Sequence, residues 1–139
     1  MMYAIDFGTS NTVITRWNAD TQRPETVSLK ELSTQQKGNP PLVPSLLYVE
    51  QAAETAEASK GLAGQAVRDR GLDIANDPRF FRNFKRGIGS SVQGFMPELD
   101  GHAMTFEQVG SGIKHKVVYQ LREQEAAFAG LFITVPVDS

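Results

Sequence analysis

The 139-residue sequence contains no cysteine, no long hydrophobic run and no marked excess of one charge. The absence of cysteine excludes disulfides, thiolate metal ligands and cysteine nucleophiles. The longest apolar stretch, residues 131–137, is far shorter than the ~20 residues that cross a bilayer. Near the N-terminus, Asp6 interrupts the apolar residues where a signal peptide would continue. We therefore expect a cytoplasmic protein that makes no membrane contact.

The charges nearly balance, with 14 Lys and Arg against 16 Asp and Glu and a net charge of −2. A chain with this balance has no overall positive field to attract nucleic acid, so we expect no nucleic-acid partner. Hydrophobic residues make up 40% of the sequence and charged residues 22%, which is typical of a folded domain. The length corresponds to one domain or to part of one.

Hydrophobic patterning predicts short strands and short helices along the chain. We expect strands at 2–5, 12–17, 25–29, 45–49 and 131–135, a hairpin at 92–103 around Asp100-Gly101, and short helices at 64–70 and from Pro78 to Lys85. Residues 30–44 are predicted to form a loop, and residues 50–60 either a helical turn or a hairpin tip. Trp17 and Tyr48 are predicted to lie in the core.

A longer helix is predicted to begin after Thr105. Thr105 and Gln108 have the spacing of a capping box, in which each side chain bonds to the other residue's backbone. Apolar residues then recur at steps of three and four: Phe106, Val109, Ile113, Val117 and Leu121. One face of this helix is therefore expected to pack onto a sheet.

The last predicted strand, 131–135, is apolar in the manner of strands that lie inside a sheet with helices on both faces. The preceding residues do not supply all of these neighbours. We therefore expect an α/β fold in which residues 1–139 form the first, incomplete part of a larger domain. An open strand edge of this kind invites pairing with a second copy, so we also expect self-association.

The residues best suited to chemistry lie between Ile5 and Thr12. A glycine in a turn between strands lets a phosphate approach the backbone, and successive N–H groups in such a turn can bind an anion. Thr9 and Ser10 add hydroxyl groups, and Asp6 could hold Mg²⁺ or its water shell. On these residues alone, an ordinary hairpin turn with an aspartate cap remains an open alternative. The chain has neither a P-loop lysine motif nor a three-glycine dinucleotide motif.

Five segments in order resemble one protein family. Ile5–Asn11 resembles the first phosphate loop of the actin-like ATPases, in the form used by the seventy-kilodalton heat-shock (DnaK-like) chaperones. Four further segments resemble that family's proline-serine strand, its entry to a short helix, its lysine-arginine segment and its hinge strand: Val43–Tyr48, Gly61–Ala66, Phe84–Gly89 and Ile133–Pro136. Together the five segments extend over nearly the whole chain.

This resemblance implies a fold and a set of roles. The fold would be part of lobe I of an actin-like (ribonuclease H-like) ATPase domain, without a substrate-binding domain. Asp6 would hold Mg²⁺ through water, Gly8, Thr9, Ser10 and Asn11 would form the phosphate loop with Thr9 nearest the γ-phosphate, Lys85 would position the attacking water, and Pro136 would act as a hinge. ATP or ADP with Mg²⁺ would be the cofactors, and client polypeptides and co-chaperones the partners of the full-length protein. Gly87, where the family has a bulkier aliphatic residue, and the longer segment after Tyr48 depart from the pattern.

Two other functions stay open at this point. Arg79, Arg82, Lys85 and Arg86 interleave with phenylalanines, so residues 79–86 could be a solvated helix face, a phosphate contact or a nucleic-acid-binding cluster. The chain could also be a non-catalytic, actin-like interaction module.

The resemblance generates a first prediction about turnover. Because a second lobe would supply the remaining catalytic groups, residues 1–139 should hydrolyse ATP no faster than the same chain carrying Lys85→Ala. A phosphate-release assay on the two proteins measures this. Turnover that depends on Lys85 would contradict the expectation of an incomplete site.

Overall fold

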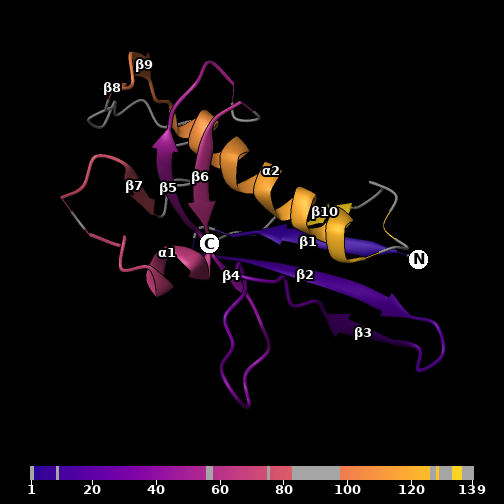
Figure 1. Ribbon diagram of the computed structural model, residues 1–139. Coiled ribbons are helices and arrows are strands. Elements are labelled where there is room, and N and C mark those ends of the chain that lie inside the picture. Colours follow the sequence, from indigo (N-terminus) through magenta and orange to yellow (C-terminus); the bar gives the residue numbers. More distant parts are fainter. Residues whose placement is uncertain are drawn as a thin grey trace.

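The computed structural model describes residues 2–8, 10–55, 58–74, 76–82, 98–125, 128 and 133–135. These residues form a mixed α/β structure in which a long helix lies across two small sheets (Figure 1). No helix in these ranges is long and apolar enough to cross a membrane.

The larger sheet confirms the predicted opening meander. β1 (Tyr3–Phe7), β2 (Asn11–Asn18) and β3 (Arg23–Thr26) pair antiparallel in sequence order, although β3 begins and ends earlier than the predicted third strand. The short β4 (Val43–Pro44) pairs with the start of β2. β10 (Ile133–Val135) lies parallel to β1, so the predicted last strand is present where the structure describes it.

The second sheet corrects one prediction and resolves another. β5 (Leu46–Gln51) pairs antiparallel with β6 (Lys60–Ala63), and the described residues between them, 52–55 and 58–59, contain no helix, so the hairpin alternative is the one observed. The helix predicted from Pro78 is wrong in its described part, because Phe80–Arg82 is strand β7 and pairs with the other edge of β5. Phe81 packs against the core. Pairing with a buried strand outweighs the local pattern, since strand preference depends strongly on tertiary neighbours.

The two helices lie where the pattern places them. The short α1 (Gln65–Asp69) follows Gly64, and the long α2 (Phe106–Gln124) begins with the predicted capping box between Thr105 and Gln108. The predicted apolar face of α2 is buried in the core at Val109, Ile113, Val117 and Leu121. Strand residues from both sheets, among them Tyr3, Ile5, Ile14, Leu47 and Val49, pack into the same core. Helix α2 therefore joins the two sheets.

Trp17 is not a core residue, contrary to the prediction. Its side chain is 46% exposed, whereas Ile14 on the same strand is buried. Arg16 forms an ion pair with Glu125 at the end of α2, so alternation along β2 directs Trp17 to the opposite face of the sheet. That face also exposes Met2, whose carbonyl accepts a hydrogen bond from the Trp17 N–H at 3.1 Å. Tyr48 is only half-buried.

The predicted Asp100-Gly101 hairpin is present and is fastened to the second sheet. It joins β8 (Glu98–Leu99) to β9 (His102–Ala103), with positive φ at both turn residues. The Asp100 carboxylate accepts hydrogen bonds from Arg79 Nη2 at 2.8 Å, Arg79 Nη1 at 3.1 Å and the Ala52 N–H at 2.9 Å. Arg79 is therefore an ion-paired residue and not part of a solvated helix face.

These bonds predict an acid-sensitive contribution to stability. The hydrogen bonds from Arg79 and then from the Ala52 amide lower the pKa of Asp100 from 3.8 to about 2. Because the pKa is lower in the folded state than in the unfolded state, the carboxylate stabilises the fold fully above its unfolded pKa. That contribution is lost as the pH falls toward the folded pKa.

Urea denaturation of the wild type and of Asp100→Asn, from neutral pH to about pH 2, tests this expectation. The wild type should have the larger free energy of unfolding at neutral pH. The difference in this free energy between the two proteins should shrink as the pH falls. Asparagine tolerates the positive φ of this position, so the variant removes mainly the charge. Asp20→Asn at the exposed turn after β2 is the control. Its difference from the wild type in free energy of unfolding should not change with pH in this way. A pH-independent difference for Asp100→Asn would contradict the prediction.

Candidate functional site

The candidate site is the tight connection between β1 and β2. Phe7 and Thr12 are the last paired residues of the two strands, and the Gly8 N–H then donates to the Asn11 carbonyl at 2.9 Å. A Cβ atom on residue 8 would lie 2.7 Å from that carbonyl oxygen, which is closer than real Cβ contacts. Glycine is therefore required at position 8 for the backbone to turn this tightly.

Ser45 holds this connection from the side. The Ser45 hydroxyl donates to the Gly8 carbonyl at 3.1 Å, and the Ser45 N–H donates to the Ser10 carbonyl at 2.8 Å. Ser45 is only 1% exposed, so little water reaches its own hydroxyl and N–H groups. Two carbonyl groups of the connection are thus fixed by one buried residue at the junction of β4 and β5. The sequence indicated a strand at Ser45 but gave no sign of these long-range bonds.

Asp6 lies two residues before Gly8 on β1. Its neighbours Tyr3 and Ile5 are buried in the core, which places Asp6 on the sheet face opposite them in the alternation of the strand. Within the described part of the chain, its Oδ1 atom is buried and has no hydrogen-bond partner. A buried carboxylate oxygen without a donor is costly, so this atom is suited to a cation or an ordered water.

A cavity of about 320 Å³ opens beside the same connection. Its lining comes from the β1–β2 connection, β5, α1, β7 and the segment after α1: Ser10, Asn11, Leu46, Arg68, Asp73, Phe80 and Arg82. The described residues offer no carboxylate within ion-pair distance of either arginine. The cavity thus combines two available guanidinium groups with polar residues of the connection.

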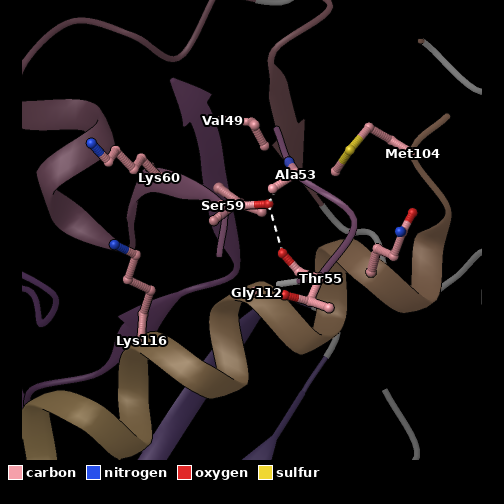
Figure 2. A pocket seen from close by; sticks show the side chains of 11 residues that line it. Val49, Ala53, Thr55, Ser59, Lys60, Met104, Gly112 and Lys116 are labelled. Carbon is pink, nitrogen blue, oxygen red and sulfur yellow. Dashed lines mark hydrogen bonds between the residues drawn. The ribbon is translucent and has the colours of Figure 1, made fainter. Parts of the chain in front are cut away.

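A second hollow lies between the β5–β6 hairpin and α2 (Figure 2). Its interior is about 30 Å³, room for one or two waters. The Ser59 hydroxyl donates to the Thr55 carbonyl at 2.9 Å and accepts from the Ala53 N–H at 3.0 Å. Lys60 and Lys116 lie together on one side of the hollow, away from Met104 (Figure 2). Because Ser59 is already hydrogen-bonded and the space is small, this hollow is the weaker candidate.

The structure brings together part of the predicted site. Asp6, Gly8, Ser10 and Asn11 lie in one segment around the β1–β2 connection. Three further predicted residues, Thr9, Lys85 and Pro136, lie outside the described residues. Among the residues that the structure describes, no three His, Asp or Glu side chains are grouped as metal ligands. Any Mg²⁺ here would have to be held largely through water and phosphate, which is the usual mode for this ion.

No protein-family model matches the chain, and a search of curated proteins finds no match.

The bonds of Ser45 yield a prediction about stability. Ser45→Ala removes the donor to the Gly8 carbonyl and leaves that partly buried acceptor without this bond, so the free energy of unfolding should fall by about 1 kcal/mol or somewhat more. Ser28→Ala is the matched control, because within the described ranges the exposed Ser28 hydroxyl bonds only to the Gln35 side chain, from which it accepts at 3.0 Å. Its effect should be within about 0.5 kcal/mol. Urea denaturation measures both changes, and equal effects would show that Ser45 does not hold the connection.

Proposed function

We propose that this chain binds the phosphates of ATP or ADP, with Mg²⁺, at the connection between β1 and β2. In this role it is the ATP-binding part of a DnaK-like chaperone ATPase with an actin-like lobe. The observation that carries the proposal is the buried Oδ1 atom of Asp6, two residues from the glycine turn, which has no hydrogen-bond partner among the residues that the structure describes. An anionic oxygen in this position favours a cation, and a glycine turn favours a phosphate.

The backbone geometry supports phosphate binding. Gly8 has no side chain to keep a ligand away from the turn. Hydrogen bonds from Ser45 hold the Gly8 and Ser10 carbonyls pointing toward Ser45. A rigid turn loses little conformational entropy when a ligand binds. Ser10 and Asn11 add polar side chains beside the adjacent cavity. A preorganised anion site also needs N–H or O–H donors directed at the anion, and the side chains of Ser10 and Asn11 are groups of this kind.

Asp6 is suited to hold the water shell of Mg²⁺ in this arrangement. When bound, Mg²⁺ would offset the negative charge of the phosphates during transfer to water. By the family resemblance, Thr9 contacts the γ-phosphate, Lys85 positions the attacking water and Pro136 acts as the hinge. The same resemblance makes client polypeptides and co-chaperones the partners of the full-length protein.

The alternative of nucleic-acid binding through residues 79–86 is weakened by the ion pair of Arg79. That guanidinium bonds Asp100 and the carbonyls of Val49 and Glu50. A phosphate backbone would have to break several of these bonds to use it. The cluster therefore offers fewer available charges than the sequence indicates.

Asp6 provides the test. We expect the wild-type chain to bind ADP with Mg²⁺ at least about tenfold more tightly than ADP with a chelator, since charge-assisted contacts are worth about this much. Asp6→Asn should abolish this dependence on Mg²⁺, whereas Asp20→Asn, the same charge change at an exposed turn, should keep it. Isothermal titration calorimetry measures each affinity. Equal Mg²⁺ dependence in all three proteins, or no binding of nucleotide to the wild type, would overturn the proposal.

A further inference from the structure

We propose that the cavity lined by Arg68 and Arg82 is an oxyanion subsite that binds a phosphate group. The group could be free inorganic phosphate or the terminal phosphate of a nucleotide bound at the β1–β2 connection. Only the second source rests on the proposed function, because binding of inorganic phosphate needs nothing but the cavity itself.

The fold places the two arginines on different elements around one space. Arg68 lies on the exposed side of α1, since Ala66 and Val67 are that helix's buried residues. Arg82 ends β7 and stands in register with Leu46, the residue that directly follows Ser45. Ser45, which holds the β1–β2 connection, is therefore adjacent in sequence to Leu46, which pairs with Arg82. The cavity and the turn share this junction.

The hydrogen-bonding capacity of both guanidinium groups is largely unused. Among the described residues, the Arg68 side chain makes one hydrogen bond, a long contact of 3.4 Å to Gln65 Oε1, and the Arg82 side chain makes neither a hydrogen bond nor an ion pair. In contrast, Arg16 and Arg79 are ion-paired to acidic side chains. Unpaired arginines that face a common cavity are suited to phosphate, whose oxygens match the planar guanidinium fork.

The remaining lining defines the charge and size of the ligand. Asp73 is the one acidic residue among the described lining residues, so with two arginines these residues carry a net charge of +1. Leu46 and Phe80 supply apolar walls, which lower the local dielectric and strengthen an ionic contact. A volume of about 320 Å³ accommodates a phosphate group with part of its hydration. A small oxyanion therefore fits the lining better than an apolar ligand or a cation does.

Titration of the whole chain with inorganic phosphate at low ionic strength, followed by NMR chemical shifts, tests the subsite. Arg68→Gln and Arg82→Gln should each weaken binding about tenfold, the usual effect of losing one charged hydrogen-bond donor. Arg70→Gln removes the same charge from the C-cap of α1, outside the cavity lining, and should change the affinity little. Asp73→Asn should tighten binding, because it removes the carboxylate that repels the anion.

This opposite effect of Asp73→Asn separates a binding site from a merely structural role, since loss of fold would weaken binding in every variant. Thermal unfolding of each variant shows whether it is folded. Absence of saturable phosphate binding at millimolar concentrations, or equal losses in Arg68→Gln, Arg82→Gln and Arg70→Gln, would overturn the proposal.

The source of the phosphate is resolved with Mg²⁺-ADP and a non-hydrolysable ATP analogue. If the terminal phosphate occupies the cavity, Arg82→Gln should weaken the triphosphate about tenfold and the diphosphate little. If inorganic phosphate binds with the expected variant pattern but no nucleotide binds, the subsite stands as a site for free phosphate and the proposed function fails. If nucleotide binds through Asp6 and the arginine variants are without effect on either ligand, the proposed function stands and the subsite fails.

Discussion

The pair of hydrogen bonds made by Ser45 is the constraint on which the arrangement of the candidate site depends. One residue donates to two carbonyl groups of the β1–β2 connection, and it stands where β4 of the first sheet passes into β5 of the second. The same short segment therefore closes the turn and carries the chain between sheets. Ser45 itself is buried, so its two donor groups depend on these carbonyls for hydrogen bonds.

Helix α2 gives that junction a rigid support. Its buried face contributes to a core that contains residues of both sheets. Close packing is visible at Gly112, where a Cβ would lie 3.2 Å from a methyl group of Leu47. At its far end, Glu125 pairs with Arg16, and the Gln124 amide donates to the Ser28 carbonyl at 2.6 Å. The helix is thus fixed at its C-terminal end and packs closely on β5 at Gly112.

Local signals in the sequence predicted much of this fold. The capping box at Thr105, the helical spacing behind it and the Asp100-Gly101 turn each depend on residues close together in the chain, and each is present. The strand at Phe80–Arg82 could not be recognised in this way, because its pairing partner β5 lies some thirty residues earlier. Exposure of Trp17 was missed for a similar reason. Its face of the sheet is determined by which side α2 covers, and that is a tertiary property.

The candidate site likewise contains some residues that could be predicted from the sequence and others that could not. Gly8 and Asp6 were recognisable from residue type and spacing. In contrast, the hydroxyl of Ser45 and the guanidinium groups of Arg68 and Arg82 reach the site only because strands and a helix that are distant in sequence pack together. A contact of this kind leaves no periodic signal in one sequence. The buried oxygen of Asp6 likewise becomes apparent only once the surrounding strands are in place.

The parallel pairing of β10 with β1 has a consequence for the order of folding. Ala4, Ile5 and Asp6 stand in register with Ile133, Thr134 and Val135, so opposite ends of the described chain meet beside the candidate site. Closing so long a loop is entropically costly and makes such contacts slow to form. During synthesis on the ribosome, the edge of β1 that pairs with β10 stays unpaired until nearly all of this sequence has been translated. Chaperone protection of that nascent edge would accordingly matter most during translation.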